Sequence, residues 1–202
     1  MILVGFIQSE DPPPSPPPFI QLVPMTGGCF AVCVEAGEKD EQLLMTIPTY
    51  GHAIWGAFSP QPESLTLLPI RAPRRFSDAE AVRQFHRQHE ATLTWFFEDL
   101  RHHHEWEVAL DVKDRGTYLE SPPELVPSLW ERCVAQAADV CPLPLKVLEP
   151  GALIWRGALL IPDQAADDWL RDAALMRQQA AEAGLHFQVI GPLPPFHFVP
   201  EL

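Results

Sequence analysis

The sequence is poor in basic residues, with 14 lysines and arginines against 27 acids and a formal net charge of −13. A nucleic-acid-binding protein typically carries a basic surface, and this composition is the reverse. We therefore expect no nucleic-acid partner. The excess of acidic residues instead favours a chain that stays dispersed in solution.

Long apolar runs are also missing. The best candidate, residues 152–161, is interrupted by Arg156 and falls short of the roughly 20 residues that a membrane helix needs. Residues 1–7 are apolar but lack a basic segment before them and are too short for a signal peptide. We expect a cytoplasmic protein without a membrane-spanning segment.

Motifs that carry chemistry are absent as well. The sequence contains no GxSxG elbow, no glycine-rich phosphate loop, no HExxH pair and no CxxC pair. We expect no enzyme activity and no cofactor, and we expect free, buried thiols at the four cysteines, which are Cys29, Cys33, Cys133 and Cys141.

The histidines leave one alternative open. His86 and His89 are three residues apart in a predicted helix, and His102, His103 and His104 follow at its end. Imidazoles at such spacings can share a metal ion, as in a metal-dependent enzyme. Histidines in the last turn of a helix also interact favourably with its dipole, which needs no metal.

The second half of the chain alternates between strand and helix patterns. Apolar residues at every second position predict a half-buried strand over 105–112, and Ser121 with Glu124 forms a capping box before a helix that Pro142 and Pro144 end. Asp163 is a candidate cap for the next helix, which Gly184 ends. The remaining predicted strands are 145–148, 153–161 and 185–190.

The resulting order is strand, helix, strand, strand, helix, strand, which is the ferredoxin-like βαββαβ arrangement. The first half predicts strands at 2–7, 29–35 and 65–70, a short helix at 49–58, and a long helix over 77–103 opened by a Ser77–Glu80 capping box. We therefore expect an α+β protein of two small ferredoxin-like domains, 1–104 and 105–202, with the first domain modified.

A proline-rich loop and a basic patch stand out in the first half. Residues 11–18 contain six prolines, which favours an extended, exposed loop that is either a spacer or a ligand for a proline-binding groove. Five arginines gather between residues 71 and 87, where they form either a surface for an acidic partner or a solvated face; they are Arg71, Arg74, Arg75, Arg83 and Arg87.

The last stretch of the chain, 184–199, carries the most specific signal. After the predicted strand, Gly191 and Pro192 mark a break, and the prolines that follow hold the chain extended. The apolar residues Phe196, Phe198 and Val199 then require a surface to pack against.

This ending, Gly-Pro-Leu-Pro-Pro-Phe-His-Phe-Val over 191–199, resembles the GPWPPYxFV ending of the gas vesicle GvpF/GvpL family. Leu193 and Phe196 stand where the family has Trp and Tyr. The strand beginning Glu105-Trp106 resembles the family's EWxVK strand, and the segment 67–71 resembles its LPLRF strand. The opening strand shares only Gly5 and its apolar character, and Ala72-Pro73-Arg74 replaces the family's Phe-Gly-Thr.

The resemblance implies a two-domain α+β fold and a role as an accessory or minor structural protein of gas vesicles. It implies binding to the hydrophobic major shell protein during assembly, with other accessory proteins as further partners. We place the contact surface on the sheet, the domain junction and the tail, with these candidate residues: Gly191, Pro192, Leu193, Pro194, Pro195, Phe196, Phe198, Trp106 and Arg71. A small-molecule sensor that uses the sheet face as a pocket is the other alternative.

Overall fold

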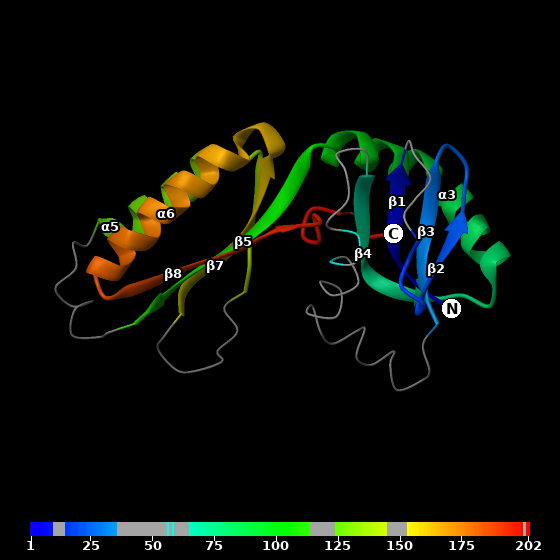
Figure 1. Ribbon diagram of the computed structural model, residues 1–202, viewed down its shortest axis with the longest axis horizontal. Coiled ribbons are helices and arrows are strands. Elements are labelled where there is room, and N and C mark those ends of the chain that lie inside the picture. The colour runs from blue at the N-terminus through cyan, green and yellow to red at the C-terminus, as the bar shows by residue number, and fades with distance from the viewer. Residues whose placement is uncertain are drawn as a thin grey trace. The chain divides into compact units, whose positions relative to one another are not determined.

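The computed structural model describes residues 1–9, 15–35, 56, 58, 65–113, 124–144, 153–199 and 201–202. The chain divides into two compact units, one of Met1–His102 with Pro194–Leu202 and the other of His103–Leu193. Each unit contains a four-stranded antiparallel sheet and at least one helix (Figure 1). The predicted α+β class is confirmed, while the ferredoxin-like description of the units stays an interpretation.

The first sheet has the strand order β2-β3-β1-β4. Its strands are β1 (Ile2–Ser9), β2 (Ile20–Pro24), β3 (Cys29–Val34) and β4 (Leu65–Arg75), and each pairs antiparallel with its neighbours. Residues 2–7 of β1 are all buried, as a strand covered on both faces requires. Strand β2 is an addition to the predicted elements.

The N-cap of helix α3 (Ala79–Leu100) lies one residue later in the sequence than predicted. Asp78, not Ser77, is the N-cap, and its carboxylate accepts a hydrogen bond of 2.9 Å from the Ala81 N–H. Ser77 instead donates its hydroxyl to Asp78. The helix ends at Leu100 rather than 103, because His102 takes a positive φ of 64° and turns the chain into the next strand.

The first sheet is covered on both faces. Phe6 contacts His86 of α3 at 5.7 Å between ring centroids, so one face of the sheet packs against this helix. Neighbouring residues of a strand point to opposite faces, and Ile7 belongs to a second cluster on the face away from α3. That second cluster comprises Ile2, Val4, Ile7, Ile20, Val32, Val34 and Phe58.

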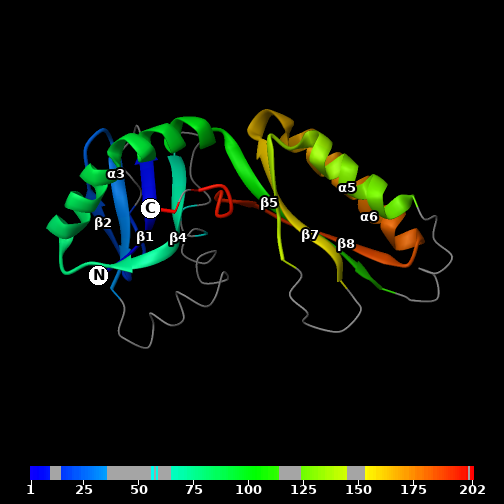
Figure 2. The ribbon, with the colours of Figure 1, turned by 180° about the vertical axis from the view of Figure 1, so that it is seen from behind.

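The second sheet has the order β6-β7-β5-β8. Its strands are β5 (His103–Val112), β6 (Asp139–Pro142), β7 (Leu153–Pro162) and β8 (Leu185–Leu193). Helices α5 (Leu125–Gln136) and α6 (Ala166–Glu182) both lie over one face of this sheet (Figures 1 and 2). The strand and helix order of this half is the predicted one.

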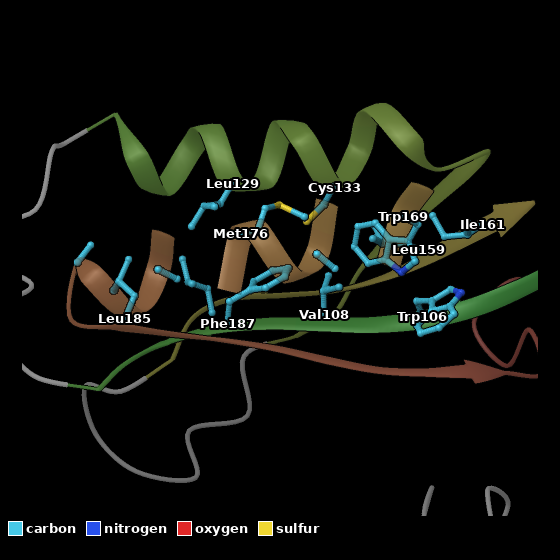
Figure 3. Packing of buried hydrophobic residues seen from close by; sticks show 14 residues of the cluster. Trp106, Val108, Leu129, Cys133, Leu159, Ile161, Trp169, Met176, Leu185 and Phe187 are labelled. Carbon is cyan, nitrogen blue, oxygen red and sulfur yellow. The ribbon is translucent and has the colours of Figure 1, made fainter. Parts of the chain in front are cut away.

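The core of the second unit lies between these helices and the sheet (Figure 3). Trp106, Val108 and Leu110 alternate along β5 and all point to the helices, where Trp169 and Met176 of α6 meet them. The Cys133 sulfur of α5 lies 4.0 Å from the Met176 sulfur of α6, so the two helices also contact each other. These side chains are at most 5% exposed.

Several local predictions were wrong or lie outside the described residues. The helix that was predicted to follow Ser121 and to end at Pro142 already ends at Gln136, and Asp139–Pro142 forms strand β6 instead. Asp163 opens a short 3-10 helix, Asp163–Ala165, and does not cap α6. The predicted strand 145–148, Ser121 and nearly all of the predicted helix 49–58 lie outside the described residues.

Strand β8 continues further than predicted. Gly191 and Pro192 do not break it; β8 extends to Leu193, which pairs with Glu105 of β5 after a register shift. The strand tolerates a proline because it lies at the edge of the sheet, where a missing backbone donor interrupts no second ladder. Of the predicted loop 11–18, residues 15–18 are described, and they form neither helix nor strand.

Candidate protein-binding surfaces

The tail, residues 194–199 and 201–202, belongs to the compact first unit, whereas the sequence analysis assigned it to the domain 105–202. Pro195 and Val199 are buried, the latter at 2% exposure, and Phe196 packs against the cluster on the first sheet's open face. Two backbone turns hold its shape, from Phe196 N–H to the Pro194 carbonyl and from Phe198 N–H to the Pro195 carbonyl. The first sheet therefore supplies the apolar surface that the tail requires.

Two arginines of β4 fix the tail in place. Arg71 donates a 2.6 Å hydrogen bond to the His197 carbonyl and lies 4.0 Å from the Glu201 carboxylate. Arg74 donates to the backbone oxygen of Leu202 and also stacks its guanidinium 5.3 Å from the Phe85 ring centre. A proline-rich segment cannot complete a sheet ladder, so these side-chain donors satisfy its carbonyls.

A cavity of about 350 Å³ lies between β4 and the tail, lined by Ile70, Arg71, Arg74, Glu201 and Leu202. Its volume suits a small ligand. Its cations, however, already bind the tail: Arg71 contacts His197 and Glu201, and Arg74 contacts Leu202. The cavity therefore offers little uncompensated charge to an incoming anion.

Two further arginines of the predicted basic patch, Arg83 and Arg87, are paired within α3. Arg83 and Arg87 both donate to the carboxylate of Glu80, at 3.2 and 2.8 Å. The hydrogen bond from Arg87, followed by that from Arg83, lowers the pKa of Glu80 below its usual value. Arg71 and Arg74 contact the tail, and Arg83 and Arg87 pair with Glu80, so these four arginines of the patch have partners within the chain.

Trp106 is a core residue and not an exposed anchor. It is 5% exposed, and its ring meets Trp169 edge-on at 6.4 Å. Gly191 lies directly against it, since a Cβ at this glycine would come within 2.6 Å of the indole ring. Trp106 therefore positions the end of β8, and its site role is structural.

The candidate residues that reach the surface are fewer than predicted. Gly191 and Pro192 are exposed, and Leu193, Pro194 and Phe198 are half-buried. Together with the buried Pro195 and the packed Phe196, they form one continuous segment. Arg71, with 44% of its side chain exposed, supports that segment from β4.

In the part of the chain that the structure describes, His86, His89 and His102–His104 belong to no group of three potential metal ligands. His86 is 5% exposed against Phe6, and burial lowers its pKa. His89 stacks on Phe85 at 4.5 Å between centroids, and His104 lies 2.6 Å from the Asp163 carboxylate. Each of these imidazoles has an aromatic or carboxylate neighbour in the fold, so the sequence spacing alone gives no metal site.

The four cysteines are free, as predicted; Cys29, Cys33 and Cys133 are also buried as expected, whereas Cys141 is half-buried. Burial raises the pKa of Cys29, Cys33 and Cys133 to about 12 each. A thiol with so high a pKa carries almost no thiolate at neutral pH and is a poor nucleophile.

Polar side chains pair across the face of the second sheet that lies away from its helices. Arg156 binds the buried Glu107 at 2.5 Å, and Gln188 donates to Asp111 at 2.7 Å. His186 also approaches Asp111, at 3.4 Å. These pairs link β5 to both of its neighbours, β7 and β8.

Exposed apolar residues were missed by the sequence analysis. Large hydrophobic side chains that are 46–56% exposed stand on three elements of the two units, namely Trp95 on α3, Leu170 and Leu175 on α6, and Ile190 on β8. The helical spacing could have excluded Leu170 and Leu175 from the buried stripe, which Trp169, Ala173, Met176 and Ala180 define. Ile190 gave no such signal, because its exposure depends on which strand lies at the edge.

Comparisons with known proteins place this fold. Residues 126–200 match the family described as gas vesicle synthesis protein GvpL/GvpF. The structure is similar to the crystal structure of GvpF from Microcystis aeruginosa, with a TM-score of 0.64, 14% identity and 98% of each chain covered. It is also similar to GvpF from Anabaena sp. PCC7120, with a TM-score of 0.70, 12% identity and coverage of 98% of this chain and 95% of that one. No curated protein matches the sequence significantly.

Proposed function

We propose that this chain acts as a member of the gas vesicle GvpL/GvpF family, whose model it matches over residues 126–200, and that it binds the hydrophobic major shell protein and assists vesicle assembly. The proposal is supported by the agreement of two findings, the family match over residues 126–200 and the fold shared with the GvpF crystal structures over nearly the whole chain. The role is that of an accessory or minor structural protein without catalysis, located in the cytoplasm and at the gas vesicle.

The physical properties of the chain suit such a role. A net charge of −13 disperses a complex that contains an aggregation-prone apolar subunit. The surface also carries exposed apolar side chains, such as Trp95 and Ile190, at which an apolar partner can be held. No helix of the described residues is long and apolar enough to cross a membrane.

The tail remains part of the proposed contact surface. Deleting residues 192–202 is a poor test, because it removes the buried Pro195 and Val199 and so weakens the first unit itself. Phe198→Ala is sharper, since Phe198 is only half-buried. If the tail binds the shell protein directly, this variant captures less of it while its unfolding midpoint changes little; unchanged capture by the folded variant removes the tail from the surface.

The assembly role is tested in cells that form gas vesicles. Removal of this chain is expected to reduce the number of vesicles seen by electron microscopy, and the wild-type chain is expected to restore it. A chain carrying Leu175→Ala, which alters an exposed side chain, serves as the expression-matched control and is expected to restore it equally. Normal vesicle numbers without the chain would contradict the assembly role.

A further inference from the structure

The edge strands of the two sheets differ in how they are protected. An edge strand exposes unpaired backbone N–H and C=O groups, and proteins usually blunt such edges with charges, prolines or short length. Strand β2 has five residues and ends in Pro24, and β6 has four residues and ends in Pro142. Strand β4 carries three arginines and two prolines among its eleven residues.

Strand β8 has none of these protections over most of its length. It is nine residues long, Leu185–Leu193, and contains no Asp, Glu, Lys or Arg. Its first six residues, Leu185–Ile190, also contain no proline or glycine. In the part of the chain that the structure describes, β8 pairs with β5 on one side and with no strand on the other.

Near Ile190, an exposed apolar side chain lies on each side of the sheet beside the open edge of β8, whereas His186 and Gln188, on the same face as Ile190, are polar. Ile190 is 52% exposed on β8 itself. Phe187 of the same strand points into the helix-side core, and Ile190, three residues further along the strand, has the opposite parity and lies on the other face. One side of the edge is therefore apolar near Ile190.

The other side is covered by α6. Asp172 and Gln179 of α6 bind Arg132 of α5, so they mark the flank of α6 that faces α5. At about 100° per residue, Leu170 lies roughly 160° around the helix from Asp172, on the opposite flank. Because α6 packs on β8 and α5 on β7, this opposite flank is the one above the β8 edge. Leu170 is 46% exposed there.

We infer that the free edge of β8 is a strand-addition site, at which an extended, uncharged apolar segment of the shell protein pairs with Leu185–Ile190. The added strand hydrogen-bonds to the outward backbone groups of β8, while its side chains meet Leu170 on the helix side and Ile190 on the other. The inference rests on the proposed function, because it takes the shell protein as the partner.

The charge distribution favours this partner over a second copy of the chain. The β8 edge carries no formal charge in a molecule of net charge −13. If two copies of the chain paired edge to edge, two molecules that each carry a net charge of −13 would be brought together, whereas an apolar segment adds no charge.

Substitution by lysine tests the site without disturbing the core. Lysine is the residue that natural edges use to prevent strand addition. Ile190→Lys and Leu170→Lys are each expected to weaken capture of the shell subunit about tenfold, the change that 1.4 kcal/mol produces. Leu175→Lys is the matched control, on the same helix at 56% exposure but about 60° from Asp172 on the α5 flank, and it is expected to bind as the wild type does.

Hydrogen exchange supplies an independent readout. In the wild-type complex, backbone amides within residues 186–190 are expected to exchange at least tenfold more slowly than in the free protein, because a new strand pairs with alternate groups. If the wild type captures no shell subunit, the proposed function fails. If it does, and both lysine variants match Leu175→Lys with unprotected β8 amides, the edge site is wrong while the function stands.

Self-association is the remaining outcome that would overturn the inference. Sedimentation of the purified wild-type chain and of the Ile190→Lys variant is expected to give the same mass in solution for both. A wild-type dimer that becomes monomeric in Ile190→Lys would assign the edge to a second copy of the chain.

Discussion

Gly191 shows how one small residue sets the course of the chain between the second sheet and the tail. Its backbone lies against the indole ring of Trp106, and a Cβ there would approach two ring carbons to 2.6 and 2.7 Å. Contacts below 3.0 Å between heavy atoms require movement of the ring, which is held in the core by Trp169 at 6.4 Å. The glycine is therefore required by packing.

Gly191→Ala is expected to lower the free energy of unfolding by about 1–3 kcal/mol, the usual cost of an overpacked site. Urea unfolding followed by tryptophan fluorescence measures it. Gly56→Ala is the control, because a Cβ at Gly56 meets nothing within 4 Å. Equal unfolding midpoints for the two variants would contradict the packing argument.

Asp78 supplies a pH-dependent cap to α3. Hydrogen bonds from the Ala81 N–H and from Ser77 lower the pKa of its carboxyl below 3.8. A lowered folded-state pKa stabilises the fold above the unfolded value of 3.8 and loses that contribution as pH falls through the folded value.

In the variant Asp78→Ala, the unfolding midpoint is expected to fall relative to the wild type at about pH 6. The difference should shrink as the pH is lowered below the folded-state pKa, because the wild-type carboxylate is then protonated. Urea unfolding across this pH range measures the change. A difference that stays constant with pH would show that the charge of Asp78 has no part in the cap.

The tail is the element on which the closure of the first unit depends. It covers the face of the first sheet that α3 leaves open, through Phe196 and Val199, while Arg71 and Arg74 bind its carbonyls. The proline content of the tail suits this arrangement. A proline-rich segment has few backbone N–H donors, so its carbonyls are the main backbone groups that need hydrogen-bond partners. The tail is thus first a structural part of the unit.

Val199→Ala is expected to destabilise the first unit by about 1–2 kcal/mol, since it removes two buried methyl groups at roughly 0.8 kcal/mol each. Leu175→Ala, at a side chain that is 56% exposed, is the control and should change stability little. Thermal unfolding of both variants measures the effect. Equal stability of the two variants would place Val199 outside the core.

Helices α5 and α6 are joined by a polar clamp. Arg132 binds both Asp172 and Gln179, and Gln136 donates to Asp172 at 2.7 Å. Asp172→Ala is expected to cost about 1 kcal/mol in urea unfolding, a modest value because both charges are partly exposed, at 31% and 26% of their side chains. The exposed pair Arg171–Asp168 is the control, and Asp168→Ala should cost less; an equal loss would show that the clamp adds nothing.

Much of the element pattern could be predicted from the sequence. The alternation in 105–112 and the apolar stripe after Ser77 identify β5 and α3, since each has a clear period. Strand β2 could not be found, because five residues between prolines resemble a loop. The apolar spacing in α3 predicts a buried stripe that includes His89 and Phe96, whereas His86, three positions earlier, and Phe97, one position later, are buried instead.

The candidate site was harder to predict than the fold. The tail motif was recognised, but its location on the first unit depends on contacts more than a hundred residues apart in sequence, such as Arg71 with His197. The sequence also placed Trp106 among the binding residues, whereas β5 turns it into the core. The open edge of β8 depends on strand order, which no local pattern contains.

At the scale of the whole molecule, the account combines an acidic, dispersing surface with local apolar sites. The net charge of −13 acts on the solubility of a complex, while Leu170 and Ile190 offer apolar contact at an uncharged edge. Binding through apolar contact and strand pairing is not weakened by screening, unlike attraction between exposed charges. We therefore expect the binding of the shell protein to depend little on salt concentration.

The most direct test is therefore capture of the hydrophobic shell subunit by the purified chain, quantified at low salt and at about 0.5 M salt, where exposed charges are strongly screened. The account predicts specific capture at low salt that is retained at high salt, above the level bound by an unrelated protein of similar net charge. Capture no greater than by that protein, with this chain shown to be folded, would contradict the central claim.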